Sequence, residues 1–229
     1  MQRINPLSKS ESGQGLVEIG LIIVLVAMVS VLALSATGTS LREIYCNVIS
    51  GLGIENACTD AFLEDFSDIS DWHKSWGNCD VSNGELCCNR WGGIFNTEYS
   101  GEDYTIDVGK ANLAKGNGYG VWFRAQDYDR PEGYIFQYDP GYAGGAFLFR
   151  KWVDGHELRP FAVQRDRNFD WHGADHQVQI VANGNTFTAY VDGEEVLTAT
   201  DDTYQEGGVG VRTWDRTQAC FDDLMITSP

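Results

Sequence analysis

The sequence predicts an α+β protein, in which one long N-terminal apolar α-helix is followed by an antiparallel β-sandwich. Residues 19–41 carry no charged side chain, which favours a long apolar helix. From residue 61 onward, short runs rich in Val, Ile, Tyr, Phe and Trp alternate with Gly, Asn and Asp, a pattern typical of strands and turns. We therefore expect a helix at 14–53, a linker at 54–60 and a sandwich at 61–229.

The composition limits the classes of function. The chain has 229 residues with 43% hydrophobic content, enough for one sizeable domain and an appendage. Its net charge of -17 argues against nucleic acid as a partner. The six cysteines include no C-x-x-C pair and the four histidines lie far from them, so disulfides are favoured over zinc. Disulfides imply an oxidising compartment outside the cytoplasm.

The apolar segment at 19–41 is long enough to span a bilayer, because a helix through it would be about 34 Å long. Arg3 and Lys9 precede it, so the leader is expected to stay in the cytoplasm while the residues after Leu41 are sent outward. Small side chains recur along the segment and would allow close helix packing in an assembly. The precursor is therefore expected in the cytoplasmic membrane.

A cleavable signal peptide is an alternative for this segment. Its cleavage site would be imitated by the small residues Ala33 and Ser35, or by Ala36 and Gly38. Glu18 counts against it, because an acidic residue inside an apolar stretch is costly and is usually functional. A chance acidic residue at the edge of a plain single-pass anchor is a further alternative.

The sequence around Glu18 has a specific resemblance. The chain there reads Ser12-Gly13-Gln14-Gly15-Leu16-Val17-Glu18-Ile19. This stretch resembles the processing region of type IV pilins, especially the Flp/Tad class. The resemblance implies that a prepilin peptidase cuts after Gly13, removes the leader 1–13 and makes Glu18 the fifth mature residue. The sequence departs from the family at Ile19, where Tyr is frequent, and in its greater length.

The resemblance implies a structural pilin that polymerises through its N-terminal helix into an extracellular pilus on the cell surface. The partners implied are further copies of the chain, the prepilin peptidase and the pilus assembly machinery. After cleavage, the new ammonium group of Gln14 and the carboxylate of Glu18 would both lie in a low dielectric. Pairing between them, within or between subunits, would lower the cost of both charges and set the register of the subunits.

The second part of the chain shows repeated hairpin signals. Asn83-Gly84, Asp154-Gly155, Asn183-Gly184 and Asp192-Gly193 are residue pairs that accept positive φ. The pattern gives about twelve strands, which implies two packed antiparallel sheets.

The order of these segments resembles that of concanavalin A-like, laminin-G-like jelly rolls. The likeness begins at 62–68, includes Gly118-Tyr119-Gly120-Val121-Trp122-Phe123-Arg124-Ala125 and closes at Cys220-Phe221-Asp222-Asp223-Leu224. Such folds include enzymes, lectins and inert structural modules, so the fold alone does not decide the function.

The hairpin at Asn83-Gly84 predicts one disulfide directly. Counting outward from the turn places Cys79 opposite Cys88, where Cα atoms lie about 4.5 Å apart, within disulfide reach. Cys87 then faces the other way and is left for a cysteine on the closing strand. The two further predicted pairs are Cys87 with Cys220, and Cys46 with Cys58.

Alternation along the strands suggests a glycan-binding surface. If Val121 and Phe123 face the core, their neighbours face the other side of the sheet. Sugars are held by aromatic faces and planar polar groups, which this surface would offer. The candidate glycan-binding residues are Trp122, Arg124, Gln137, Arg150 and Trp152. The alternative is that these aromatic side chains only pack on the sheet.

No enzyme is expected, because the Glu-x-Asp-x-x-Glu motif of family 16 glycoside hydrolases is absent. Calcium is a further expectation from the jelly-roll resemblance, which implies a structural ion where the first and last strands meet. The candidate ligands are Glu64, Asp65, Asp222 and Asp223, and their oxygen chemistry suits Ca2+. Acidic residues at an exposed strand end, with no metal, are the alternative.

Taken together, these features predict a pilus subunit that displays a β-sandwich for cell adhesion, with a carbohydrate as the candidate ligand. The alternative is a single-pass membrane-anchored lectin-like protein or glycan hydrolase. The two differ in processing, because only the pilin would begin at Gln14.

Overall fold

Every regular element in residues 61–228, the part of the chain that the computed structural model describes, is a β-strand. The predicted class, α+β, is therefore wrong for this part, which is all-β. The α component rested on the apolar run before residue 61, and the alternating pattern beyond it gives strands only. The helix predicted at 14–53, the leader at 1–13 and the linker at 54–60 lie outside the described residues.

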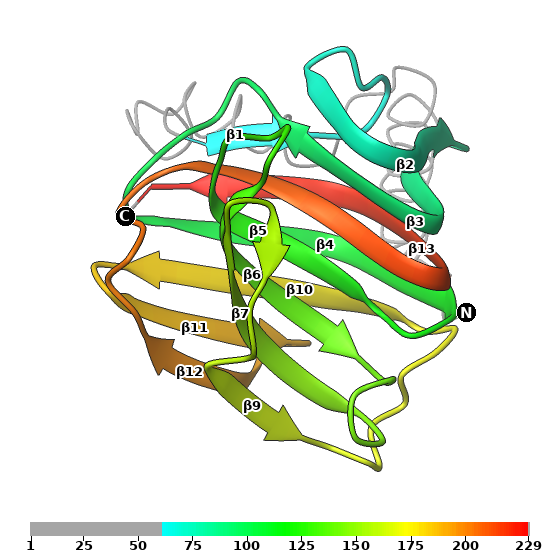
Figure 1. The fold of residues 1–229 in the computed structure, drawn as a ribbon. Helices are drawn as coiled ribbons and strands as arrows, with labels where there is room; N and C mark the ends of the chain where they lie inside the picture. The colour runs from blue at the N-terminus through cyan, green and yellow to red at the C-terminus, as the bar shows by residue number, and fades with distance from the viewer. Residues whose placement is uncertain (1–60, 229) are drawn as a thin grey trace, which may run out of the picture. The chain divides into compact units, whose positions relative to one another are not determined.

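Thirteen strands make up the described part of the chain, residues 61–228, and Figure 1 shows their arrangement. They are β1 (Ala61–Glu64), β2 (Trp72–Ser82), β3 (Glu85–Asn96), β4 (Tyr104–Lys115), β5 (Tyr119–Gln126), β6 (Glu132–Asp139), β7 (Ala146–Val153), β8 (His156–Glu157), β9 (Ala162–Arg165), β10 (Asp175–Asn183), β11 (Thr186–Val191), β12 (Glu194–Thr200) and β13 (Gly208–Thr227). None of residues 61–228 belongs to a helix of the length and apolarity needed to cross a membrane.

The long strand β13 joins two sheets. Its first part, Gly208–Thr213, pairs with β5, and β6 and β7 continue from there, with β8 and β9 at the edge; we call this the front sheet. Its second part, from Gln218 to Thr227, pairs with β4, and β10, β11 and β12 follow; we call this the back sheet. The register against β3 shifts between Thr213 and Thr217, where the strand passes from one sheet to the other.

The core lies between the two sheets. Val121 and Phe136 from the front sheet and Val108 and Ile180 from the back sheet are buried in one continuous apolar cluster. Because successive side chains in a strand point to opposite faces, the residues next to these lie on the outer face of each sheet. The outer face of the front sheet is the one that carries the candidate site.

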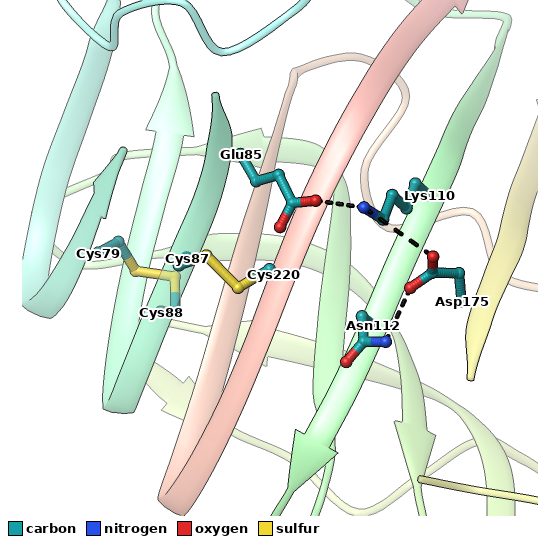
Figure 2. Close-up of a disulfide and its surroundings, with 8 residues drawn as sticks. All are labelled: Cys79, Glu85, Cys87, Cys88, Lys110, Asn112, Asp175 and Cys220. Atoms are coloured by element: carbon teal, nitrogen blue, oxygen red, sulfur yellow. Dashed lines mark hydrogen bonds and ion pairs between the residues drawn. A yellow bond between two sulfur atoms is a disulfide. The ribbon is translucent and has the colours of Figure 1, made fainter. Parts of the chain in front are cut away.

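Two disulfides fix the β2–β3 hairpin and the closing strand, in the pairing predicted from the turn. Asn83 and Gly84 both have positive φ, and Ser82 pairs with Glu85 across the turn. The structure joins Cys79 to Cys88 and Cys87 to Cys220, each with Cα atoms 4.1 Å apart (Figure 2). Cys79 and Cys88 are buried, whereas Cys87 and Cys220 are partly exposed. The pair predicted between Cys46 and Cys58 lies outside the described residues.

Candidate functional site

The outer face of the front sheet presents two neighbouring rows of side chains, one across each line of paired residues. Both rows begin on β3 and cross β13, β5 and β6 to reach β7. The first row is Gly93, Arg212, Gly120, Gln137 and Leu148. The second row is Phe95, Gly210, Trp122, Ile135 and Arg150. The two rows bring an aromatic floor and three planar polar groups onto one surface.

Aromatic rings form the floor of this face. Phe95 and Trp122 are fully buried, and Trp76 and Trp152 pack against the cluster that contains them. The Trp76 and Trp152 rings are stacked with centroids 6.2 Å apart and planes 14° from parallel. Gly93 makes room for them, because a Cβ there would lie 2.3 Å from the Trp76 ring. The rings can therefore lie close to the sheet.

Arg212 stands at the centre of the face. Its guanidinium carbon lies 4.8 Å from the centroid of the Trp152 ring and 4.9 Å from that of Trp214. Its Nη1 donates a hydrogen bond to Glu157 Oε1 at 3.2 Å. Burial lowers the pKa of the Arg212 guanidinium, and the charge of Glu157 opposes that shift. The two contacts with indole rings and the ion pair hold a cation that is only 8% exposed.

Gln137 joins the remaining polar groups into one network. Its Oε1 accepts a hydrogen bond from Arg150 Nε at 2.8 Å, and its Nε2 donates to Glu157 Oε1. Arg150 also donates from Nη1 to the Leu158 carbonyl and lies over the ring of Tyr142. Glu157 comes from β8, the short strand that follows the turn after β7. A donor group and a carboxylate are thereby fixed beside the indole rings.

Asp139 lies at the end of β6, near the same network. Burial raises its pKa from the ordinary 3.8 to about 6, against the opposing effects of the Tyr142 N–H and the charge of Arg150. The nearby Glu157 carboxylate adds to the increase. Asp139 is therefore ionised at neutral pH and becomes protonated in mildly acidic solution.

Four of the five predicted glycan-binding residues share this face. Gln137, Arg150 and Trp152 border the network around Glu157, and Trp122 lies beneath them. Trp152 and Arg150 are partly exposed, whereas Trp122 is fully buried and serves as floor.

Arg124 is the exception, because a β-bulge reverses the alternation of β5. The register against β6 shifts after Phe123, and Arg124 has a φ of 48°. Its neighbour Ala125 consequently joins the outer cluster, while the Arg124 guanidinium lies 5.2 Å from the centroid of the core ring Phe187. Its side chain donates to the carbonyls of Glu102, Tyr204 and Gly184. Arg124 thus ties loops together rather than facing the site.

The residues of this face that were not among the sequence-predicted candidates are Glu157, Arg212, Trp76, Trp214 and Asp139. Alternation along Val209-Gly210-Val211-Arg212 places Arg212 opposite to the core side of its strand. Alternation does not reveal the order of the strands in the sheet. Arg212 lies beside Trp152 and Gln137 only because β13 pairs with β5.

Calcium at Glu64, Asp65, Asp222 and Asp223 stays a prediction: in residues 61–228 no three of these side chains lie close enough together to share an ion. Glu64 accepts hydrogen bonds from Phe66 N and Trp72 Nε1, and Asp65 accepts one from Ser67 N. Asp222 accepts one from the N–H of Asp223. The carboxylates of Glu64, Asp65 and Asp222 therefore each accept a hydrogen bond from a residue nearby in the sequence.

Within residues 61–228, the only group of three side chains close enough to hold a metal is Glu85, Cys87 and Cys220. Its two sulfur atoms form a disulfide, and its carboxylate accepts a hydrogen bond from Lys110. A disulfide sulfur is not the thiolate that binds metals, so this group does not fit a metal ion.

A separate hollow of about 680 Å3 lies between β9 and β12, at the open edge between the sheets. Its lining includes Val163, Gln164, Glu195 and Leu197. None of its described lining residues is a tryptophan or an arginine, so it does not combine indole rings with guanidinium groups as the outer face of the front sheet does.

Solved structures of similar fold include carbohydrate-binding and carbohydrate-cleaving proteins. The carbohydrate-binding module CBM66 from Bacillus subtilis aligns with a TM-score of 0.61 at 20% identity, over 70% of this chain and 98% of that one. The Bacillus licheniformis β-glucanase aligns with a TM-score of 0.57 at 15% identity, over 75% and 100%. The exoplasmic/lumenal domain of VIP36, in a Ca2+/Man-bound form, gives 0.58 at 11% identity, over 74% and 90%.

These likenesses establish the fold of the described residues as a concanavalin-like or galectin-like jelly roll. No protein-family model and no curated protein matches the sequence. The comparisons give no support to a pilin, and the predicted processing residues Gly13, Gln14 and Glu18 lie outside the described residues.

Proposed function

We propose that this chain is a glycan-binding protein that uses the outer face of the front sheet and performs no catalysis. One observation carries the proposal: partly exposed Trp152 and Trp214 both lie against the guanidinium of Arg212, beside a network of Arg150, Gln137 and Glu157. Sugar rings are bound by flat aromatic surfaces together with a few fixed polar groups. The similar structures named above support the same class of ligand.

The two kinds of group would act on different parts of a sugar. An indole ring would pack against the apolar C–H face of a pyranose or furanose ring and exclude water from it. Arg150 would donate hydrogen bonds to sugar oxygens, and Glu157 would accept them. Because Gln137 and Arg212 hold Glu157 in place, little side-chain entropy would be lost on binding.

Hydrolysis is the second candidate function, since Asp139 and Glu157 are two carboxyl groups near one face and the pKa of Asp139 is raised to about 6. Glycosidases pair a protonated acid with an ionised carboxylate. The burial of Asp139 weighs against it, because a residue only 7% exposed gives a glycosidic oxygen little access to the acid. Release of reducing ends from a bound polysaccharide would establish hydrolysis and contradict binding without catalysis.

We further propose that the sandwich is presented outside the cytoplasm, a location that the two disulfides favour. A pilus and a single membrane anchor are the two modes of attachment that the sequence predicts. N-terminal sequencing of the extracellular protein separates them, because a start at Gln14 supports pilin processing and a start at Met1 contradicts it.

The binding proposal is tested by affinity electrophoresis of the full chain in gels that contain single polysaccharides. Trp152→Ala and Trp214→Ala should each weaken retention about tenfold or more, because each removes a stacking surface. Tyr190→Ala is the matched control, since Tyr190 is a partly exposed aromatic residue on the back sheet. Equal retention of all three variants would contradict the proposal.

A further inference from the structure

The partly exposed members of the polar network are Arg150 and Glu157. Their side chains are 17% and 28% exposed, and Arg150 Nε lies 3.7 Å from Glu157 Oε1. Arg212, at 9%, lies behind them. A ligand resting on the Trp152 side of the face would therefore meet one guanidinium and one carboxylate side by side.

Hydrogen bonds within the network hold the Arg150 guanidinium and the Glu157 carboxylate, and they determine which atoms are left for a ligand. The contacts of Glu157 within the network all go to Oε1, from Gln137, Arg212 and Arg150. Arg150 donates from Nε to Gln137 Oε1 and from Nη1 to the Leu158 carbonyl. Among the hydrogen bonds of residues 61–228, none uses Glu157 Oε2 or Arg150 Nη2. The carboxylate oxygen Oε2 and the guanidinium nitrogen Nη2 thus remain for a ligand.

A neighbouring donor and acceptor suit two hydroxyl groups on adjacent carbons. A hydroxyl both donates and accepts, so one oxygen can accept from Arg150 while the other donates to Glu157. Two such oxygens lie on the order of 3 Å apart, so both can bond at once to two groups that, like Arg150 and Glu157, lie side by side. A carboxylate ligand has only acceptors and would leave Glu157 without a partner.

The charges favour the same ligand. Arg150 and Arg212 are balanced at neutral pH by Glu157 and Asp139, so the network has no excess positive charge for an anion. An acidic sugar would bring its charge next to Glu157, on a chain whose net charge is -17. Like charges at such short range are repelled.

We propose, resting on the glycan-binding function above, that Arg150 and Glu157 recognise a vicinal diol of an uncharged sugar unit and that the site discriminates against acidic glycans. Arg212 is a positioning residue in this account, because it fixes Glu157 and the two indole planes without being exposed itself.

The test uses the full chain and a panel of immobilised mannan, galactan, xylan, polygalacturonate and the methyl ester of that polygalacturonate. Each neutral polymer is also presented after periodate oxidation and borohydride reduction, which cleaves vicinal diols and leaves other hydroxyls. The proposal predicts that oxidation weakens binding of the retained neutral polymer at least tenfold. It also predicts that polygalacturonate binds at least tenfold more weakly than its ester.

Two variants complete the test. Glu157→Gln should weaken binding of the neutral polymer at least tenfold and reduce the preference for the ester over polygalacturonate. Asp107→Asn, which changes a back-sheet carboxylate bonded to Gln177, should leave both unchanged. Periodate cleavage also opens the sugar ring, so in that arm only unchanged retention is decisive. The comparison of polygalacturonate with its ester leaves the rings intact and needs no variant, so it tests the proposal even if Glu157→Gln does not fold.

The outcomes separate this proposal from the function on which it rests. Retention by none of the polymers would contradict glycan binding itself. Retention that is insensitive to periodate, or equal for polygalacturonate and its ester, would overturn the diol proposal while glycan binding stands.

Discussion

The outer faces of the two sheets follow the same alternation but carry different chemistry. On the back sheet, polar side chains find partners on nearby strands: Lys110 on β4 bonds Glu85 on β3, across β13, and Asn112 donates to Asp175 on the neighbouring β10 at 2.7 Å (Figure 2). On the front sheet, aromatic rings surround the buried guanidinium of Arg212.

Unsatisfied polar atoms mark the same division. Residues 61–228 contain seven buried side-chain polar atoms without a hydrogen-bond partner, and all belong to the front sheet or to the parts of β2, β3 and β13 that extend it. They are Ser75 Oγ, Asn96 Nδ2, Tyr119 OH, Trp122 Nε1, Trp152 Nε1, Arg212 Nε and Thr213 Oγ1. Local rules of stability are usually broken where a protein binds or reacts. The back sheet is therefore suited to stability and the front sheet to binding.

The largest effect is expected on the back sheet, from removal of the Cys87–Cys220 disulfide. It closes a loop of 133 residues, so replacing both cysteines by serine should lower the free energy of unfolding by about 5 kcal/mol. Cys79–Cys88 closes only 9 residues and should contribute about 2.5 kcal/mol by the same loop-closure effect. Urea unfolding of the two double variants measures the difference. Loss of glycan binding in the folded Cys87/Cys220 variant would contradict the division between the sheets.

Arg212→Met should have opposite effects on binding and stability. The variant removes a buried cation whose Nε has no partner. The free energy of unfolding should therefore fall by no more than about 1 kcal/mol, and an increase is also consistent with the account. Affinity for the polysaccharide should fall at least tenfold, because Glu157 and the indole rings lose the group that positions them. Chemical denaturation and affinity electrophoresis give the two numbers. A variant that keeps full affinity would show that Arg212 does not position the site.

Asp139 makes the stability of the front sheet depend on pH. Its folded pKa, about 6, exceeds the ordinary 3.8, so folding favours the protonated form. The stabilisation from that proton is complete below pH 3.8 and is lost as the pH rises through 6. Asp139→Asn should therefore raise the free energy of unfolding by on the order of 2 kcal/mol at pH 7 and change it little at pH 4. An equal effect at both pH values would contradict the raised pKa.

The smallest effect is expected for the ion pair on the back sheet. Lys110 and Glu85 are both partly exposed to solvent, so Lys110→Met should change the free energy of unfolding by less than about 1 kcal/mol and leave binding unaltered. Thermal unfolding at low and high salt measures the pair. A change in glycan affinity would mean that the two faces are coupled.

The features predictable from the sequence are those set by neighbours along the chain. The Asn83-Gly84 turn fixes its own register, so the Cys79–Cys88 pair followed from counting along the strands. Alternation likewise placed Trp122 and Gln137 on one face. Alternation gave the wrong face for Arg124. A β-bulge at this residue, which has a positive φ, reverses the alternation, and the residue types there do not indicate a bulge.

The features that could not be predicted depend on contacts between distant strands. Arg212 and Glu157 are separated by more than fifty positions along the chain and meet only because β13 enters the sheet beside β5. The calcium expected at Glu64 stays a prediction; the sequence did not reveal that Phe66 N and Trp72 Nε1 donate hydrogen bonds to its carboxylate oxygens. The local sequence pattern predicts on which face of its sheet a side chain lies. The order of the strands decides which side chains meet on that face.

A crystal structure of the full chain with a fragment of its best-bound polysaccharide tests the central claim most directly. The account predicts a sugar ring within about 4 Å of the Trp152 or Trp214 ring, with a hydroxyl hydrogen-bonded to Glu157. A sugar bound instead in the hollow between β9 and β12, or on the outer face of the back sheet, would contradict it.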